Sequence, residues 1–332
     1  MPTPWPRRAP LAKAPASRAP KRLAVLPARR IGFIGLGAMG EPMARALLRA
    51  GFTVCSAVHR ERGALERLTH EGLTEAPDRA TLAAQSDVVI TCVPDAPQVR
   101  EALFGEHGAG QAAASQPARL FIDMSTISPV ASRDIAALLI ARGHRFVDAP
   151  VSGGPVRAAS GTLTIMAGGA ADDFARAEPV LRAMGTPHHV GAVGLGETVK
   201  LVNQLLIATI MLANAEGVTF AKRAGAQTDA VRNVLASATG ANYLLEQWLP
   251  KTWFAGTFEG GFAMDLLRKD LAAALDAART MKVALPASAF AYQLYTLQSS
   301  KGDGALDYSA VAKFYDDDLR NKTATEQAPG VQ

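Results

Sequence analysis

The strongest constraint on the fold is a glycine pattern that joins a short apolar run to a helical segment. The run occupies residues 31–34, and the pattern that follows it is Gly35, Leu36, Gly37, Ala38, Met39 and Gly40. In a strand-turn-helix unit Gly35 permits a tight turn, Gly37 lets the backbone approach a pyrophosphate, and Gly40 lets helix and strand pack closely. The start of the helix then offers free N–H groups to the phosphates. The pattern therefore predicts a Rossmann unit in which these six residues bind a dinucleotide.

Short apolar runs alternate with helical stretches through the first half of the chain. The runs lie at residues 31–34, 53–58, 88–93, 120–122, 146–147 and 162–167. Such alternation predicts a doubly wound, mostly parallel sheet with helices on its faces. We expect this α/β Rossmann domain to occupy residues 31–193.

The alternation of apolar runs and helical stretches ends at the glycine-rich residues 191–196. Residues 197–224 then read as one long helix that is apolar on nearly every face, which predicts a buried helix. Polar residues interrupt its apolar run before the length of about 20 residues that a membrane span needs. We therefore expect an all-helical domain at residues 194–320, built around this helix, and a tail at residues 321–332.

The basic character of the chain comes from its first 30 residues. The formal net charge is +5, but residues 1–30 hold eight Lys and Arg and no acid; removing these eight from 35 leaves 27 bases against 30 acids, a net charge of −3. A segment rich in Pro, Ala and Arg cannot bury a core, so we expect a disordered basic leader. The alternatives are an over-extended start site, a transit peptide and a nucleic-acid-binding tail; of the last two, each has an argument against it. The prolines disfavour a transit peptide, and the charge of the folded part does not favour nucleic acid as the main partner.

The cysteine and histidine content indicates neither a disulfide framework nor a metal site. Cys55 and Cys92 each lie in an apolar run, which fits a reducing, cytoplasmic environment. His188 and His189 are neighbours, but no second group of Cys, His or acidic residues accompanies them at ligand spacing. We expect a turn or surface role for this pair, and no metal.

The residues after the second apolar run bear on which nicotinamide cofactor binds. An NAD-specific site has a carboxylate there for the ribose hydroxyls, whereas this chain has His59, Arg60, Glu61 and Arg62. No acid stands at the first position, and Arg60 and Arg62 could pair with a 2′-phosphate. The pattern favours NADP over NAD, with His59 and Arg60 at the cofactor. If the register shifts by two, Glu61 would serve NAD.

Several further motifs, in a fixed order along the chain, carry a resemblance to a known family. Besides residues 32–40 they are Phe121-Ile-Asp-Met-Ser-Thr-Ile-Ser-Pro129, Asp148-Ala-Pro-Val-Ser-Gly-Gly154, Gly161-Thr-Leu-Thr164, Gly196-Glu-Thr-Val-Lys-Leu-Val-Asn203 and Lys269-Asp270. From about residue 31 to residue 314 the chain resembles the β-hydroxy acid dehydrogenase family. That family includes 3-hydroxyisobutyrate dehydrogenases and tartronate semialdehyde reductases and is related to 6-phosphogluconate dehydrogenase. The resemblance implies an NAD(P)-dependent enzyme that interconverts a short 3-hydroxy acid and its semialdehyde.

A lysine in these motifs suits the proton transfer of such a reaction. Oxidising an alcohol needs a base that takes the hydroxyl proton while hydride leaves, and the reverse reaction needs an acid. Lys200, on an apolar helix facing a cleft, would have its pKa lowered by desolvation. Asn203 lies three residues on and shares its helix face. By resemblance Lys200 is the general acid and base, and either Asn203 or Gln204 orients the substrate.

The other motifs imply further contacts. A hydroxyl and backbone N–H groups at Ser152, Gly153 and Gly154 suit a substrate carboxylate. By resemblance Val93, Pro94, Gln98, Ser125 and Thr126 lie beside the nicotinamide half of the cofactor, Lys269 reaches the cofactor from the helical domain, and Asp270 contributes to substrate binding. Arg157 could serve a second acidic group on a larger substrate, but we favour a solvent-facing role.

The sequence is also compatible with two other functions. Imine reduction is possible on the same fold, although relatives with that activity typically replace the lysine that Lys200 matches. A non-catalytic dinucleotide-binding module with a nucleic-acid-binding leader is the second alternative, and Lys200 argues against it too. By resemblance we expect a homodimer or homotetramer, with no membrane and no nucleic acid as partner.

Overall fold

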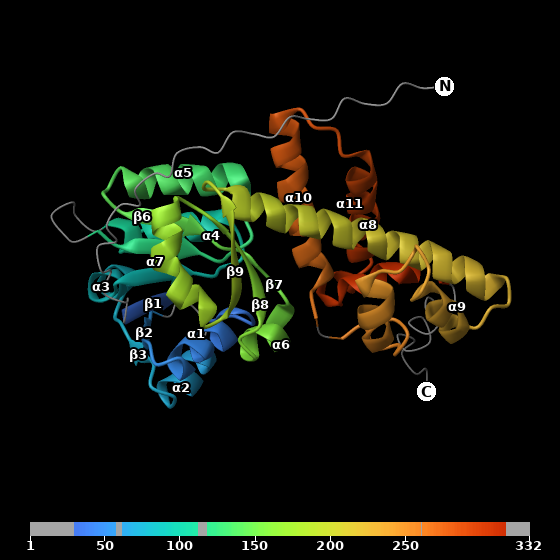
Figure 1. Ribbon diagram of the computed structural model, residues 1–332, viewed down its shortest axis with the longest axis horizontal. Helices are drawn as coiled ribbons and strands as arrows, with labels where there is room; N and C mark the ends of the chain where they lie inside the picture. The colour runs from blue at the N-terminus through green and yellow to red at the C-terminus, as the bar shows by residue number, and fades with distance from the viewer. Residues whose placement is uncertain (1–29, 58–61, 112–117, 260, 317–332) are drawn as a thin grey trace, which may run out of the picture.

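The chain folds into two lobes that one long helix connects. The computed structural model describes residues 30–57, 62–111, 118–259 and 261–316. The lobe with the sheet and the lobe made of helices lie side by side, and α8 (Leu195–Arg223) runs from the first into the second (Figure 1). The predicted leader up to residue 29, the tail from residue 317, and the cofactor residues His59 and Arg60 lie outside the described residues.

The first lobe holds a single nine-stranded sheet. Its strands are β1 (Arg30–Ile34), β2 (Thr53–Ser56), β3 (Thr74–Glu75), β4 (Val88–Thr91), β5 (Leu120–Asp123), β6 (Arg145–Asp148), β7 (Val151–Ser152), β8 (Leu163–Gly168) and β9 (Gly185–Gly191). The strand order is β3-β2-β1-β4-β5-β6-β8-β7, with β9 also paired to β8. The strands from β3 to β6 pair in parallel, and β8 runs antiparallel to both β6 and β7. The predicted mostly parallel sheet is confirmed.

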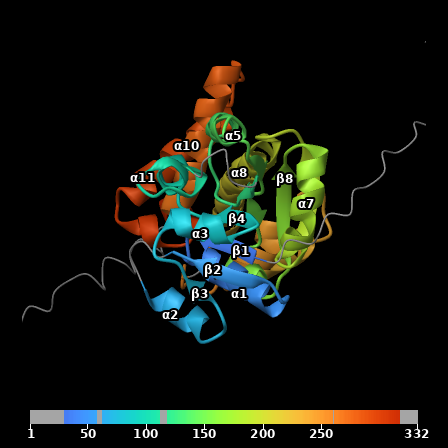
Figure 2. The ribbon, with the colours of Figure 1, turned by 90° about the vertical axis from the view of Figure 1, so that its left-hand side faces the viewer.

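Helices cover both faces of this sheet, as the doubly wound prediction requires. They are α1 (Gly40–Arg49), α2 (Gly63–Thr69), α3 (Arg79–Gln85), α4 (Ala96–Phe104), α5 (Pro129–Ile140), α6 (Gly154–Ala159) and α7 (Ala171–Arg182). Two separate apolar cores result: one packs α1, α2, α6 and α7 on one face, and the other packs α3, α4 and α5 on the opposite face (Figure 2).

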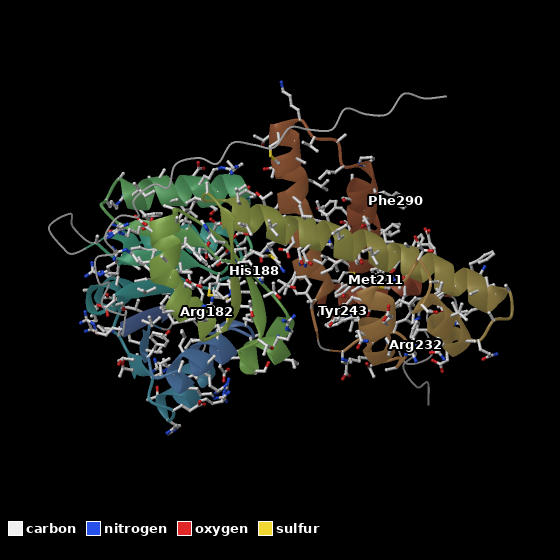
Figure 3. All side chains as sticks on the ribbon, in the orientation of Figure 1. Arg182, His188, Met211, Arg232, Tyr243 and Phe290 are labelled. Carbon is white, nitrogen blue, oxygen red and sulfur yellow. The ribbon has the colours of Figure 1, made fainter. Side chains whose placement is uncertain are left out.

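The second lobe is helical, also as predicted. Besides α8 it contains α9 (Thr228–Leu235), α10 (Met264–Met281), α11 (Pro286–Ser299) and short helical turns such as Leu244–Trp248 and Tyr308–Phe314. A third core joins Met211 of α8 to Leu267 and Leu271 of α10 and to Tyr295 of α11. Figure 3 shows Met211 on α8 and Phe290 on α11.

The prediction that α8 is buried on nearly every face is wrong. One side of α8 packs on the sheet and then on α10 and α11, but Val202, Leu206 and Phe220 on the other side are 49%, 54% and 77% exposed. Among the described residues α8 is the one helix long and apolar enough to cross a membrane, by length and composition alone. Its buried side chains line the core of the second lobe, as in a core helix.

The first turn of α8 is fixed to the sheet by close backbone packing. The backbone N–H groups of Gly194 and Glu197 donate to the two carboxylate oxygens of Asp148, at 2.7 and 3.0 Å. A Cβ at Gly196 would lie 2.3 Å from the carbonyl oxygen of Met166 on β8. Only glycine at position 196 lets the helix approach the strand this closely.

Replacing Gly196 therefore tests how the two lobes are joined. We expect Gly196→Ala to lower the free energy of unfolding by about 1 to 3 kcal/mol, because the methyl group forces helix and strand apart. The matched control is Gly217→Ala on the same helix, where a Cβ meets no atom within 4 Å. That change should stabilise the protein by about 0.5 to 1 kcal/mol, because alanine loses less entropy in a helix. Denaturant unfolding measures both, and equal effects would contradict the close packing at Gly196.

Candidate active site

The glycine pattern forms the turn between β1 and α1. Gly35 has a φ of +103°, a conformation that side chains rarely adopt. A Cβ at Gly40 would lie 1.8 Å from the carbonyl oxygen of Gly35, whereas one at Gly37 meets nothing within 4 Å. Among the described residues no side chain caps the start of α1; the N–H of Glu41 donates to the carbonyl oxygen of Gly37, and the other N–H groups of the turn remain for a ligand. These features fit the pyrophosphate of a dinucleotide, because it needs close backbone approach and free N–H donors.

The loops after β4 and β5 lie together at the carboxyl edge of the sheet. The N–H of Val93 donates to Oγ of Ser125 at 3.0 Å, so Ser125 joins the two loops. Ser125 is 3% exposed, which leaves its hydroxyl little access to a ligand. Pro94 and Gln98 are exposed and Thr126 is half-buried, so the structure leaves these three accessible beside the glycine turn.

Lys269 reaches this edge from the other lobe. Its Nζ donates to the carbonyl oxygens of Pro94 and Thr126 and lies 2.9 Å from Oδ1 of Asp270. One lysine of α10 thus holds both sheet loops that border the predicted nicotinamide position. Lys269 thus bridges the two lobes, beside the place where the sequence predicts the cofactor.

Lys200 lies in a buried polar network on the facing side of α8. Its Nζ donates to Oε1 of Gln204 at 3.0 Å, and Nδ2 of Asn203 donates to the same oxygen at 3.0 Å. The Nε2 of Gln204 in turn donates to Oδ2 of Asp270 at 2.7 Å. The structure therefore brings together four of the predicted residues, two from the catalytic set and two from the substrate set.

Burial changes the acid-base properties of Lys200. Its side chain is 7% exposed, and desolvation lowers its pKa from the ordinary value of 10.5, while the charges of Asp270 and Glu197 oppose that change. The ring of Phe262 covers the ammonium group, with Nζ 5.9 Å from the ring centroid. A lysine amine in this setting can be neutral at a pH where an exposed lysine is charged.

The network distinguishes Asn203 from Gln204, the two amides that the sequence offers for contact with the substrate. Gln204 is 2% exposed and its amide is engaged by Lys200, Asn203 and Asp270, and Asp270 is 1% exposed. Asn203 is only half-buried. The expected substrate contacts of Gln204 and Asp270 thus disagree with their burial, because the amide of Gln204 is engaged inside the protein and the carboxylate of Asp270 meets Gln204 and Lys269. Their geometry suits holding Lys200 and Lys269 in place, and leaves Asn203 as the amide able to meet a substrate.

The predicted carboxylate cradle lies at the edge strand β7 and the start of α6. Gly153 and Gly154 have φ values of +137° and +66°, which turn the chain from strand to helix. The side chain of Arg157 lies against Gly153, and its Nε donates to the carbonyl oxygen of Thr162 at 2.8 Å. Within the described part of the chain, Ser152, Gly153 and Gly154 share no hydrogen bond with the Lys200 network.

Three buried carboxyl groups near the site were not predicted from the sequence. Asp123, Asp148 and Glu197 are each 0% exposed, and burial raises the pKa of each, that of Asp148 to about 6. The signal was present in the sequence, because Glu197 stands in an apolar segment one helical turn before Lys200. For Phe262, in contrast, the sequence carries no local signal of a place beside Lys200.

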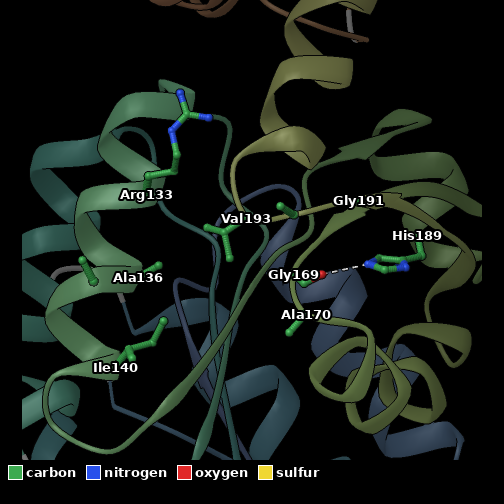
Figure 4. A pocket seen from close by; sticks show the side chains of 10 residues that line it. Arg133, Ala136, Ile140, Gly169, Ala170, His189, Gly191 and Val193 are labelled. Carbon is green, nitrogen blue, oxygen red and sulfur yellow. Dashed lines mark hydrogen bonds between the residues drawn. The ribbon is translucent and has the colours of Figure 1, made fainter.

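A depression with an apolar lining lies elsewhere on the first lobe, and none of the site residues described above lines it. It has a volume of about 690 Å³ between α5 and the end of β9, with Arg133, Ile140, His189 and Val193 among its lining residues (Figure 4). The ring of His189 hydrogen-bonds the carbonyl oxygen of Gly169 at 2.8 Å. His188 and His189 are exposed and pair with β8 as part of β9, so of the two expected roles they have the surface position and do not form a turn; Figure 3 shows His188. No group of three His, Cys, Asp or Glu among the described residues could hold a metal.

Comparison with known proteins assigns the family. Residues 30–199 match the NAD-binding domain of 6-phosphogluconate dehydrogenase, and residues 194–315 match the NAD-binding domain of NADP-dependent 3-hydroxyisobutyrate dehydrogenase. The chain is 40% identical to L-threonate dehydrogenase of Cupriavidus necator, over 86% of this chain and 96% of that protein. It is 37% identical to 2-hydroxy-3-oxopropionate reductase of Escherichia coli, over 86% of this chain and 96% of that protein. The chain belongs to the β-hydroxy acid dehydrogenase family.

A solved structure of the family supports the same conclusion. The Mycobacterium tuberculosis 3-hydroxyisobutyrate dehydrogenase, described with L-serine, superimposes with a TM-score of 0.79 at 32% identity, over 86% of this chain and 98% of that one. The resemblance inferred from the motifs is confirmed at the level of fold, family and NAD(P) binding.

The buried position of Gln204 can be tested by stability. We expect Gln204→Leu to lower the free energy of unfolding by about 1 to 3 kcal/mol, because Lys200 and Asp270 lose a buried partner. Asn203→Ala removes a half-buried amide and should cost at most about 1 kcal/mol. Chemical denaturation of both variants measures the difference. If Asn203→Ala is the more damaging change, the interior role of Gln204 is wrong.

Proposed function

We propose that this β-hydroxy acid dehydrogenase interconverts a short 3-hydroxy acid and its semialdehyde with NAD(P), and that Lys200 is its general acid and base. The observation that carries the proposal is the buried amine of Lys200, held by Gln204 where the two lobes meet. The names of the relatives support the substrate class, since they are dehydrogenases and reductases of hydroxy acids or their aldehydes.

The dinucleotide supplies a hydride acceptor for oxidation and a hydride donor for reduction. Residues of the glycine turn, Gly35 to Gly40, would hold its pyrophosphate, and Val93, Pro94, Gln98 and Thr126 would border its nicotinamide half. In oxidation the neutral amine of Lys200 takes the hydroxyl proton of the substrate. In reduction its ammonium form returns a proton to the aldehyde oxygen. The ring of Phe262 lies over this amine, and burial keeps the pKa of Lys200 low.

The substrate needs an anchor for its carboxylate and one for its hydroxyl carbon. The turn at Ser152, Gly153 and Gly154 offers a hydroxyl and backbone N–H groups for the carboxylate. Asn203, next to Lys200 in the same network, would orient the hydroxyl. 3-Hydroxyisobutyrate and the tartronate semialdehyde/glycerate pair are the candidate substrates. Lys200 disfavours imine reduction, which needs no base for an alcohol proton.

For the cofactor we propose a preference for NADP over NAD. The support is the sequence after β2, where no acid stands at the first position and Arg60 could pair with a 2′-phosphate. Arg62 supports it less than expected, because its guanidinium makes two hydrogen bonds of 2.9 Å to Glu75.

We further propose a homodimer or homotetramer in the cytoplasm. The support for assembly is a set of large apolar side chains exposed on the second lobe: Val202, Leu206, Phe220, Met281, Phe290 and Leu297. Contacts between subunits commonly cover exposed apolar side chains of this kind. The free thiols of Cys55 and Cys92 suit a reducing compartment.

The function is tested by following absorbance at 340 nm with short 3-hydroxy acids, their semialdehydes, NAD and NADP. We expect turnover on at least one acid, with the higher kcat/KM for NADP. Lys200→Met should lower kcat by about 100-fold or more, the scale of losing a general acid or base. The matched control is Lys222→Met on the same helix, whose amine pairs with Asp316 instead. If Lys200→Met keeps its activity, or if no acid or semialdehyde turns over, the proposal is wrong.

The pH dependence of the reaction should report the pKa of Lys200. Burial lowers that pKa below 10.5, so the neutral amine is present at lower pH than for an exposed lysine. Oxidation should rise with pH with a midpoint below pH 10.5, and reduction should fall through the same range. Profiles of kcat/KM in both directions measure it. A limb at the ordinary lysine value would contradict the burial of the acting amine.

A further inference from the structure

Three carboxyl groups without solvent exposure meet where α8 leaves the sheet lobe, and two of them have evident structural partners. Asp148 accepts the N–H groups of Gly194 and Glu197. Asp123 accepts from the Thr91 hydroxyl at 2.8 Å and from the N–H of Ser125 at 3.1 Å. These two carboxyl groups fix the start of α8 and the loop after β5.

Glu197 is not explained in this way. Its Oε2 accepts the N–H of Ile127 at 3.1 Å, but its Oε1, like Oδ2 of Asp123, is buried without a hydrogen-bond partner among the described residues. A buried carboxyl oxygen without a partner costs stability. Unlike Asp123, Glu197 stands on the helix that carries Lys200, so its carboxyl group can act on that amine.

The position of Glu197 suggests that role, because it touches both halves of the site. Ile127 directly follows Ser125 and Thr126, the loop that Lys269 also holds. On its own helix, Glu197 precedes Lys200 by three residues, so both side chains project from one face. Glu197 thus connects the loop beside the cofactor to the acting amine.

We propose that Glu197 is a positioning residue that sets the proton affinity of Lys200 and ties Lys200 to the cofactor loop at Ile127. The proposal rests on the proposed function, since it assumes that Lys200 exchanges the substrate proton.

The charges around Glu197 decide the direction of its effect. Asp123 of β5 and Asp148 of β6 oppose the ionisation of Glu197, and Lys269 of α10 favours it. A further charged group, Arg133 of α5, lies against Gly194 at the start of α8. Burial and the two acids raise the pKa of Glu197 well above its usual value. When Glu197 does ionise, its negative charge stabilises the ammonium form of Lys200 and raises the pKa of Lys200.

Two variants separate the charge of Glu197 from its contact with the loop. Glu197→Gln keeps an acceptor for the N–H of Ile127 but cannot ionise. Glu197→Asp keeps the charge, but its carboxyl group is one methylene short of Ile127. The control is Glu216→Gln, which lies further along α8, where its carboxylate accepts from the Tyr315 hydroxyl at 2.9 Å.

The first readout is the pH profile together with the titration of the amine itself. In Glu197→Gln we expect the limbs for oxidation and reduction to move to lower pH by about one unit, because Lys200 loses a stabilising charge. Trace acetylation of the enzyme without cofactor, read for the Lys200 peptide by mass spectrometry, should show the same shift. Glu216→Gln should leave both measurements unchanged.

The second readout is cofactor binding, followed by fluorescence titration with NADPH. Glu197→Asp should raise the Kd for NADPH by about threefold or more, because the loop at Ile127 loses its anchor, a change of about 0.6 kcal/mol. Its pH limb should stay near that of the parent. If Glu197→Gln does not fold, Glu197→Asp still decides the tie to the loop, and an unchanged Kd would overturn it.

Failure of the proposed function and failure of the role of Glu197 give different results. If Lys200→Met keeps its activity, the proposed function fails. If Lys200→Met is inactive while Glu197→Gln leaves the limb and the amine titration in place, or moves them to higher pH, only the role of Glu197 is overturned.

Discussion

The structure depends on the hydrogen bonds between Asp148 and the start of α8. One buried carboxyl group accepts two backbone N–H groups, which a helix start leaves without partners. These bonds hold the helix against β8 so closely that only glycine fits at position 196. Since Lys200 lies on the second turn of α8, its position relative to the sheet loops follows from this attachment. The joint is dry, because Asp148 is 0% exposed, and burial raises the pKa of Asp148 to about 6 even with two donors.

A dry joint explains why the polar groups of the site form a connected network. Lys200 can have a lowered pKa only if water is excluded, and every polar group buried with it then needs a partner. Gln204 meets this need because its amide has an acceptor for Lys200 and Asn203 and a donor for Asp270. Asp270 also meets Lys269, which reaches the loops of the other lobe. The acting amine and the bridge between the lobes therefore share one carboxylate.

The sequence predicts those parts of this arrangement that depend on local geometry. The glycine turn, the order of strands and helices, and the shared face of Lys200 and Asn203 follow from spacing along the chain. The interior roles of Gln204 and Asp270 do not, because they depend on a contact between α8 and α10, 66 residues apart. The same holds for Phe262, which meets Lys200 only through the folding of the second lobe. The apolar composition of α8 suggested full burial, since composition cannot show that one side of the helix lacks a neighbour within the chain.

The balance of charges at the joint limits what the site can do. Asp123, Asp148, Glu197 and Asp270 are each at most 1% exposed, Lys200 is 7% exposed, and the side chain of Lys269 is 23% exposed. Four carboxylates and two ammonium groups cannot all be charged in such a place, because each uncompensated buried charge costs several kcal/mol. Burial raises the pKa values of Asp123, Asp148 and Glu197, so ionising each of them costs free energy. Lys200 gives and takes a proton beside other groups that titrate, so its affinity for a proton is a property of the whole joint.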